Sequence, residues 1–383
     1  MRSRLLLSLI ALIAVAGCSA PQPATPAPSG SAPSVSERPA ATTAAPSPTA
    51  SAAAVAGPAA PAARQPLSPP VRVTFAHLGQ ASDAGVYIGL ERGYFAEEGI
   101  DLETLFMDSG GRMVPSLAAG QLDAGGGAVS SALINAVSRD VPIKLIADKG
   151  SQRPGFGFKA LSVRQELVDS GAVRTVADLR DRKLAVNTAT SIDIYHLHGA
   201  LQSGGLRVED VSLEEITYPD QGAALANGAI DAAISIEPIA TAMDRQRIAV
   251  KLLTLEKTSP LSQDATIIYA PHFMRDQPEA AQRFLIAYLR GVRDYNRAFT
   301  TGEGRDEVIQ ILTKYTAIKD PAVFETMGLP GLHPNGYVNA DNIRAAQEFW
   351  RAQNLTQTVV PPEQFIDNSY LEAALAVLGK VLE

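Results

Sequence analysis

Residues 217–243, TYPDQGAALANGAIDAAISIEPIATAM, contain a segment that the chain also carries about a hundred positions earlier. The segment LANGAIDA at 225–232 matches LAAGQLDA at 117–124, so the pattern L-A-x-G-x-[LI]-D-A occurs twice. Small and polar residues follow each copy. A repeated unit of this kind predicts two similar structural halves within one chain.

Each copy has the pattern of a helix, a turn and a strand. Ala and Leu favour helix, and Gly120 or Gly228 can adopt the left-handed conformation that ends one. A short apolar run follows, beginning at Leu122 or Ile230, which is typical of a buried strand. We expect each strand to deliver a loop to a sheet edge, with GGG at 125–127 in the first copy and SIEP at 235–238 in the second. The aspartates of the two copies are expected to form turn and helix-end hydrogen bonds that stabilise each half.

The N-terminus has the features of an export signal. A basic head at 1–4 precedes the apolar run 5–15, which is shorter than the roughly 20 residues of a membrane-spanning helix. The run ends in VAGC, and this resembles the processing box of bacterial lipoproteins, in which Cys18 would receive lipid. Cys18 is the only cysteine of the 383 residues, so it has no disulfide partner.

Composition divides the rest of the chain. Residues 19–70 are almost entirely Ala, Pro, Ser and Thr, and we expect a disordered tether because such a segment cannot bury enough apolar surface. Residues 71–383 have the apolar content of a folded body. The net charge of -7 gives no basic footprint for nucleic acid.

One segment of the body carries a family resemblance. VYIGLERGYFAEEGIDLE at 86–103 resembles a signature of solute-binding proteins of the SsuA/THI5-like (NMT1) group, which serve ABC importers of small molecules. The resemblance includes both repeat copies, ADLRDRKLAV at 177–186 and the Glu237-Pro238 pair. It covers most of residues 71–300, whereas the last eighty residues match only in being helical and amphipathic.

The resemblance implies a two-lobed α/β fold of the type II periplasmic-binding-protein class, with a ligand cleft between the lobes. The expected first lobe is discontinuous, 71–163 and 265–383, and the second lobe is 164–264. Two extended crossings near 158–163 and 265–270 would act as hinges. C-terminal helices at 341–353 and 370–381 are expected to pack on the first lobe.

Ligands of open α/β lobes bind at the carboxyl ends of strands and at helix N-termini. The loops that qualify follow the first strand, the two repeats and the strand before residue 187. The alternative for their hydroxyl groups is ordinary helix capping, and for the glutamate a solvated loop carboxylate. The predicted ligand-binding residues are Gln80, Ser82, Asp83, Ser130, Ser131, Thr188, Thr190, Ser191 and Glu237.

These loops contain no Arg or Lys and only two carboxylates, Asp83 and Glu237. Because a strongly anionic ligand is usually met by arginine or by several helix N-termini, we expect a neutral or weakly basic polar organic molecule. The five histidines are scattered and form no metal-binding pattern. No cofactor and no metal are expected.

The sequence thus predicts an extracytoplasmic, lipid-anchored, monomeric protein that captures a small solute and presents it to an ABC permease and its ATPase. Closure of the two lobes on the ligand would be the mechanism, without a reaction. An enzyme resembling the pyrimidine synthases of the THI5 type is the first alternative, and the absence of a cysteine cluster opposes it. A ligand-sensing domain of the cell envelope is the second.

Overall fold

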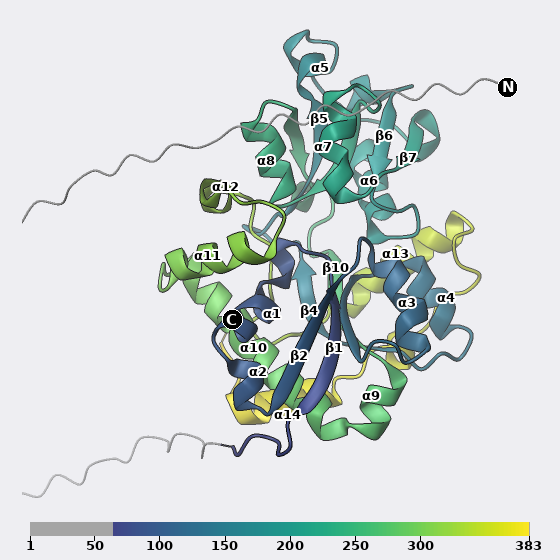
Figure 1. Cartoon of the computed structure of the whole chain (residues 1–383). Coiled ribbons are helices and arrows are strands. Elements are labelled where there is room, and N and C mark those ends of the chain that lie inside the picture. Colours follow the sequence, from purple (N-terminus) through teal and green to yellow (C-terminus); the bar gives the residue numbers. More distant parts are fainter. Residues whose placement is uncertain (1–63, 383) are drawn as a thin grey trace, which may run out of the picture. The chain divides into compact units, whose positions relative to one another are not determined.

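The computed structural model describes residues 64–382, which contain two five-stranded sheets, each covered by helices (Figure 1). The strand orders are β2-β1-β3-β10-β4 and β7-β6-β8-β5-β9. We call the parts built on these sheets the first and the second lobe. The first sheet comprises β1 (Val71–His77), β2 (Ile100–Phe106), β3 (Ala124–Ala128), β4 (Lys144–Ser151) and β10 (Gln263–Tyr269). The second comprises β5 (Lys159–Arg164), β6 (Lys183–Val186), β7 (Ser212–Glu215), β8 (Ala232–Ile236) and β9 (Ala249–Thr254).

Helices surround both sheets, and the predicted two-lobed α/β class is confirmed. The first lobe and the C-terminal region hold α1 (Ala84–Glu91), α2 (Tyr94–Glu97), α3 (Gly110–Ala118), α4 (Ser131–Val137), α9 (Pro271–Asp276), α10 (Pro278–Thr300), α11 (Arg305–Tyr315), α12 (Pro321–Thr326), α13 (Ala340–Ala352) and α14 (Ser369–Leu378). The second lobe holds α5 (Gln165–Asp169), α6 (Ile192–Ser203), α7 (Tyr218–Ala226) and α8 (Ile239–Arg245). No helix of the described residues is both long and apolar enough to span a membrane.

The two repeat copies occupy equivalent places in the two sheets. The last residue of each pattern, Ala124 or Ala232, begins a strand that pairs in parallel with the preceding strand in its sheet order, β3 with β1 and β8 with β6. The preceding glycines have the predicted left-handed conformation, with φ of +73° at Gly120 and +75° at Gly228. The internal repeat is therefore structural.

The glycine run after the first copy is expected to be a loop, and this is wrong because residues 125–127 lie inside β3. The loop expected at 235–238 is likewise half wrong, since residues 235 and 236 end β8. The missing side chains of the glycine run allow close packing on both faces of β3. A Cβ at Gly126 would lie 2.6 Å from the Lys149 side chain, and one at Gly110 would lie 2.4 Å from the backbone nitrogen of Ala128. The glycines thus admit a buried lysine on one face and helix α3 on the other.

The repeat aspartates join strands. Asp123 accepts hydrogen bonds from the backbone N–H (2.8 Å) and the hydroxyl (2.8 Å) of Thr74 in β1, and it pairs with His272 at 2.8 Å. Asp231 accepts from the backbone N–H of Lys183 (3.1 Å) and pairs with Arg164 at 3.0 Å. The expected turn and helix-end bonds are replaced by bonds to the neighbouring parallel strand, because each strand begins only after its aspartate.

The chain crosses between the sheets at 152–158 and at 255–262, since β4 and β10 belong to the first sheet and β5 and β9 to the second. The segments expected to cross, 158–163 and 265–270, largely form β5 and β10. Both are buried along almost their whole length and pair on both sides, which explains their strand-like sequences.

Two parts of the chain depart from the expected division. Residues 64–70 were assigned to the tether, but Leu67 donates its N–H to the carbonyl of Glu98, and Arg283 donates to the carbonyl of Gln65 at 2.6 Å. The C-terminal α14 packs on α10 and β4 as predicted, whereas α13 contacts α4 and β10 of the first lobe and also α6 of the second. The rest of the predicted tether and Cys18 lie outside the described residues.

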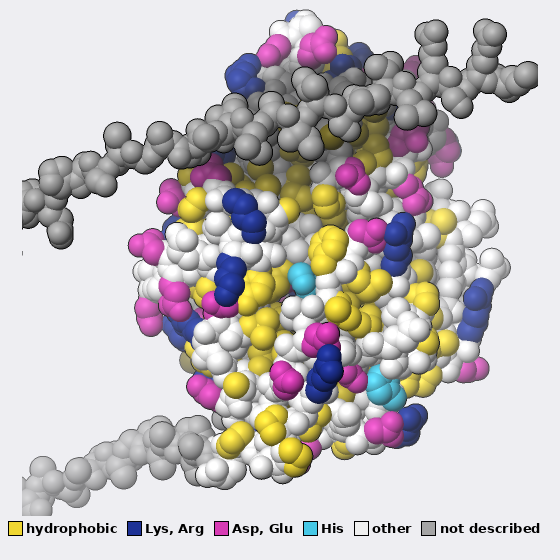
Figure 2. Space-filling model, viewed as in Figure 1, with side chains coloured by type: hydrophobic (Ala, Val, Ile, Leu, Met, Phe, Trp, Pro, Cys, Tyr) yellow, Lys and Arg dark blue, Asp and Glu magenta, His cyan; other side chains and the backbone are white. Residues whose placement is uncertain are grey.

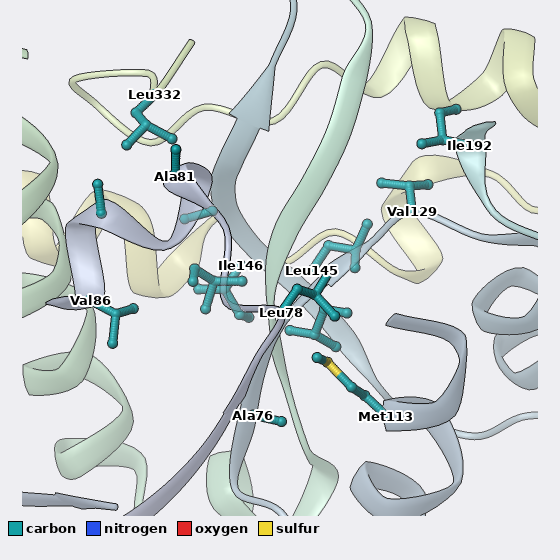
Figure 3. Close-up of a cluster of buried hydrophobic side chains, with 14 of the residues drawn as sticks. Ala76, Leu78, Ala81, Val86, Met113, Val129, Leu145, Ile146, Ile192 and Leu332 are labelled. Atoms are coloured by element: carbon teal, nitrogen blue, oxygen red, sulfur yellow. The ribbon is translucent and has the colours of Figure 1, made fainter. Parts of the chain in front are cut away.

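The apolar core continues from one lobe into the other. Figure 3 shows Val129, just after β3, close to Ile192 at the start of α6. Both side chains are fully buried, and the backbone N–H of Ile192 donates to the carbonyl of Val129 at 3.0 Å. The lobes are thus in direct contact at the ends of β3 and β6.

Candidate ligand-binding site

The loop after β1 brings three predicted residues together around a lysine of β4. Residues 81–83 form a 3-10 turn in which Asp83 accepts a hydrogen bond from the backbone N–H of Gln80 at 2.9 Å. The ammonium group of Lys149 lies 2.7 Å from Asp83 and 3.2 Å from the hydroxyl of Ser82. Because the Asp83 and Lys149 side chains are fully buried, this pair is an internal part of the first lobe.

The serines after the first repeat meet the loop after β6. The hydroxyl of Ser130 accepts the N–H of Leu133 at 3.2 Å and caps α4. Ser131 donates its backbone N–H and its hydroxyl to the carbonyl of Thr190, at 2.8 and 3.1 Å. Ser130 and Ser191 form a β-bridge. These predicted residues therefore contact one another across the lobes.

The loop of the second lobe is arranged by its own helix. The hydroxyl of Ser191 donates to the carbonyl of Thr188 at 2.9 Å and accepts the N–H of Asp193 at 3.2 Å, which caps α6. Thr188 is partly buried and Thr190 is exposed. The capping alternative thus applies to Ser130 and Ser191, and both caps face the other lobe.

Glu237 is held inside the second lobe, away from the other predicted residues. Its carboxylate accepts hydrogen bonds from the backbone N–H and the hydroxyl of Thr241, both at 2.9 Å, and pairs with Lys251 at 3.1 Å. The N–H of Gly328 in the C-terminal region donates to it at 3.2 Å. With these partners and only 2% exposure, Glu237 ties α8 to β9 and to the C-terminal region.

A second buried lysine links the lobes near the crossings. Lys159 at the start of β5 lies 2.7 Å from Asp193 and 3.8 Å from Asp264 in β10. The hydroxyl of Tyr218 donates to Asp193 at 2.7 Å, and His196 lies 2.9 Å from Asp264. This network contains groups from both sheets.

The charges of this network support one another. Burial alone would lower the pKa of the Lys159 ammonium, but Asp193 and Asp264 outweigh burial and raise it. Burial alone would raise the pKa of Asp264, but Lys159 and His196 hold it below its usual value. Lys159 and Asp264 are therefore both charged at neutral pH, and their attraction acts between the lobes.

A cavity of about 380 Å³ lies between the lobes, beside these contacts. On the face shown in Figure 2, hydrophobic side chains gather near the middle, in the region between the two sheets. Gln80 is the only predicted site residue among those that line the cavity. The lining comes from β1 and its loop, β2, the second lobe and the end of α11: His77, Leu78, Gly79, Gln80, Phe106, Pro219, Ile239, Tyr315, Thr316, Ala317 and Lys319.

His77 lines this cavity, and its imidazole ring has one hydrogen-bond donor. Its Nδ1 accepts the backbone N–H of Gly79 at 3.1 Å and faces the hydroxyl of Tyr87 at 2.8 Å. Burial lowers the pKa of the imidazole, so the ring is neutral at neutral pH. Since a backbone N–H can only donate, Nδ1 is the acceptor and the proton resides on Nε2. The Nε2–H group is therefore available to a hydrogen-bond acceptor.

The other groups of the cavity favour a flat, uncharged ligand. The ring of Phe106 is 58% exposed, and Tyr315 stacks on Tyr87 with ring centroids 4.7 Å apart. The buried carbonyl oxygen of the Gln80 side chain has no hydrogen-bond partner. The Lys319 ammonium donates to three backbone carbonyls between 2.7 and 2.9 Å away, so its hydrogen-bonding capacity is satisfied. Aromatic faces with one donor suit a polar ring system.

Most cavity residues carried no local signal in the sequence. Phe106 ends an ordinary strand pattern, and Tyr315 lies in the C-terminal region, which was predicted only to be helical. Lys149 and Lys159 resemble surface residues because each lies near a strand end. Only the sheet topology, which brings β1, β2 and the end of α11 together, could have grouped them. Among residues 64–382, no three His, Cys, Asp or Glu side chains are placed to hold a metal ion.

Two sheets of matching strand order, two crossings and a cavity lined by both lobes define a bilobal solute-binding-protein fold. The chain belongs to the NMT1/THI5-like family, whose model matches residues 80–297, more than half of the sequence. The Riboflavin-binding protein RibY of Chloroflexus aurantiacus is 24% identical over 382 residues, which cover 96% of this chain and 97% of RibY.

Solved structures share the fold at low sequence identity. The alkanesulfonate-binding protein SsuA from Xanthomonas axonopodis pv. citri, bound to MOPS, superimposes with a TM-score of 0.64 at 16% identity and covers 79% of this chain and 100% of its own. The periplasmic nitrate-binding protein NrtA from Synechocystis PCC 6803 has a TM-score of 0.65 at 15% identity, covering 81% and 89%. The desulfurization enzyme DSZB also has this fold, with a TM-score of 0.56 at 18% identity, covering 80% and 99%.

Proposed function

We propose that this protein is the solute-binding component of an ABC importer and that it captures a neutral, ring-containing polar organic molecule in the cavity between its lobes. The observation that carries the proposal is the cavity of about 380 Å³, to which both lobes contribute. A molecule held there would contact Phe106 from the first lobe and Ile239 from the second. It would therefore favour the closed arrangement over an open one.

Closure is the step that the inter-lobe contacts support. The bonds from Ser131 to Thr190 and from Ile192 to Val129 join the lobes and would break if the cleft opened. Each of these hydrogen bonds contributes about 1 kcal/mol net to the stability of the closed form. A few such bonds and a ligand can therefore shift the population toward the closed form without making closure irreversible. We take the moving bodies to be the units built on the two sheets, which places the hinges in the crossings 152–158 and 255–262.

The class of ligand follows from the charges and from a relative. The cavity offers the His77 Nε2–H donor and aromatic faces. The name of RibY gives riboflavin as the ligand of that relative, and riboflavin carries a planar ring system with acceptors and an N–H donor. Riboflavin is accordingly the first probe for this protein. We propose binding without a chemical reaction, which distinguishes the protein from DSZB.

The partners and the location follow from the same role. We propose that lipid on Cys18 anchors the protein to the outer side of the cell membrane, where a monomer presents its solute to a permease and an ATPase. Cys18→Ala should abolish lipid modification and release the protein from membranes. A variant that stays membrane-bound and still carries lipid would contradict the anchor while leaving the binding function open to its own test.

Binding is tested by mass spectrometry of any molecule released from the purified full chain, followed by calorimetric titration of that molecule and of riboflavin. We expect Phe106→Ala to weaken binding about tenfold, since aromatic stacking contributes ~1–3 kcal/mol. Leu105→Ala, a half-exposed neighbour in the same strand outside the cavity, should bind normally. The proposal fails if no small molecule binds, or if Phe106→Ala binds the released molecule as tightly as the wild type.

A further inference from the structure

A second cavity of about 760 Å³ lies against the first crossing and the end of α10, and it shares no residue with the cavity between the lobes. We call it the arginine groove. Three arginines line it, and no described carboxylate does. Its lining residues are Arg153, Phe156, Arg293, Asn296, Arg297, Thr300, Pro334, Val381 and Leu382.

Two of these arginines lack a carboxylate partner among the described residues. Arg153 forms no ion pair there, its buried Nε atom has no hydrogen-bond acceptor, and its guanidinium lies 5.4 Å from the ring centre of Phe156. Arg293 donates only to backbone carbonyls, those of Pro334, Leu378 and Gly379. Neither guanidinium group therefore forms a direct ion pair within the described chain, although the charge of Arg153 does act on the buried Asp148.

The third arginine, Arg297, lies beside Arg293 and carries ion pairs of its own. Arg297 is one helical turn beyond Arg293, so the two like charges share one face of α10. Burial lowers the pKa of Arg293, and Arg297 lowers it further. Arg297 pairs with Asp294 and, at 3.9 Å, with Glu303, neither of which lines the groove. A bound anion would relieve the repulsion between these guanidinium groups.

The remaining walls are apolar. Phe156 and Pro334 form one part, and Val381 and Leu382 form another, with Leu382 97% exposed. An inorganic ion would leave this surface in contact with water. A molecule with an acidic head and an apolar body would cover it while meeting the arginines.

We propose that the arginine groove is a second binding site, which takes an amphiphilic organic anion with a carboxylate or similar acidic head. The head pairs with Arg153 and Arg297, and the apolar body lies on Phe156 and Leu382. Because Arg153 belongs to the crossing 152–158, an occupied groove contacts one of the two connections between the lobes. This site is independent of the ligand of the inter-lobe cavity.

The test is calorimetric titration of the full chain with 4-phenylbutyrate. We expect saturable binding that weakens as salt rises, and about tenfold weaker binding for both Arg153→Gln and Arg297→Gln. Arg290→Gln on the same helix outside the groove, and Phe106→Ala in the inter-lobe cavity, should bind like the wild type. Arg293 is left intact because its bonds hold the C-terminal segment.

Two further probes separate the parts of the proposal. The neutral 4-phenylbutanamide lacks the charge, and acetate lacks the apolar body, so both should bind at least tenfold more weakly than 4-phenylbutyrate. Equal binding of either probe would overturn the amphiphilic site. The proposal is likewise overturned if 4-phenylbutyrate does not bind at millimolar concentration, or if it binds the two groove variants as tightly as the wild type.

Discussion

Each lobe buries a lysine–aspartate pair, and the two pairs have different surroundings. Lys149 and Asp83 are 2.7 Å apart, both fully buried, and both belong to the first lobe. Lys159 and Asp193 are also 2.7 Å apart in the second lobe, but Asp264 of the first sheet lies 3.8 Å from the same lysine. One pair thus serves a single lobe, and the other is shared between two.

Closure of the lobes affects the two lysine–aspartate pairs differently. A pair inside one rigid body keeps its geometry when the lobes move, so it contributes to stability alone. A pair that includes a group of the other lobe changes its energy with the angle between the lobes. Buried charges are costly unless they are paired, so Lys159 favours positions in which Asp264 stays near.

The largest effect is expected for Asp83→Asn, which removes the charge opposite Lys149 at nearly constant volume. Breaking a fully buried pair should lower the free energy of unfolding by about 3–5 kcal/mol. Asp193→Asn should cost less, about 1–3 kcal/mol, because Asp264 still compensates Lys159. Urea unfolding of each variant measures both values. Asp101→Asn, at an exposed position of β2, is the matched control and should change little.

The distinction between a pair within one lobe and a pair shared by two lobes is wrong if the two substitutions lower the free energy of unfolding equally. It is also wrong if the Asp193 variant is the less stable one. A double substitution of Asp193 and Asp264 to Asn sharpens the comparison, since it leaves Lys159 without a carboxylate. That variant should lose more than the sum of the single losses.

The next effect concerns the repeat aspartates. Asp123→Ala should lower the free energy of unfolding by about 2–3 kcal/mol, because three hydrogen-bonding partners, two of them on β1, lose an acceptor. Asp231→Ala should cost about 1–2 kcal/mol, since it loses one backbone bond and one partly exposed ion pair. Thermal and urea unfolding give both values. Equal losses would show that the hydrogen bond donated by the Thr74 hydroxyl to Asp123 adds nothing to stability.

A smaller effect is expected for the two helix caps that face each other. Ser130→Ala and Ser191→Ala should each cost about 1 kcal/mol through the loss of an N-cap bond. Their bridge across the lobes is formed by backbone atoms, so the double variant should equal the sum within ~0.5 kcal/mol. Urea unfolding of both single variants and the double variant tests this. Coupling beyond that range would mean that the hydroxyl groups themselves hold the lobes together.

The smallest effect on stability is expected in the cavity. Phe106 is 58% exposed, so Phe106→Ala should change the free energy of unfolding of the ligand-free protein by no more than about 0.5 kcal/mol. Ile239→Ala, from the second lobe, should cost more because Ile239 is 9% exposed. Both should weaken ligand binding in titrations if both lobes touch the ligand. Loss of binding in only one of them would reduce the site to a single lobe.

Much of the fold could be predicted because its signals are local. The left-handed glycines 120 and 228 and the apolar run after each depend on neighbours in sequence. The repeat then implied two lobes of one design. The family resemblance supplied the bilobal class, which the sheet orders confirm.

The functional residues were harder to predict because their environment is set by distant segments. Polar groups at strand ends were expected to face a ligand, yet Asp83 meets Lys149 from β4, and Glu237 meets Lys251 and Gly328. The sequence around a lysine near a strand end does not show that the lysine is buried, because burial depends on a carboxylate partner from a distant segment. The cavity likewise combines β1 and β2 with a helix end more than two hundred residues away.

The position of β10 in the first sheet also bears on how the chain folds. β10 lies between β3 and β4, and β4 has no other strand partner in its sheet. All strands of the second sheet, by contrast, come from the continuous stretch 159–254. The chain is synthesised from its N-terminus. The second lobe can therefore complete its sheet while the first lobe still exposes the unpaired edges of β3 and β4. The first lobe begins earlier in sequence but finishes later, so its two open edges are the places where an unfinished molecule is most exposed to aggregation.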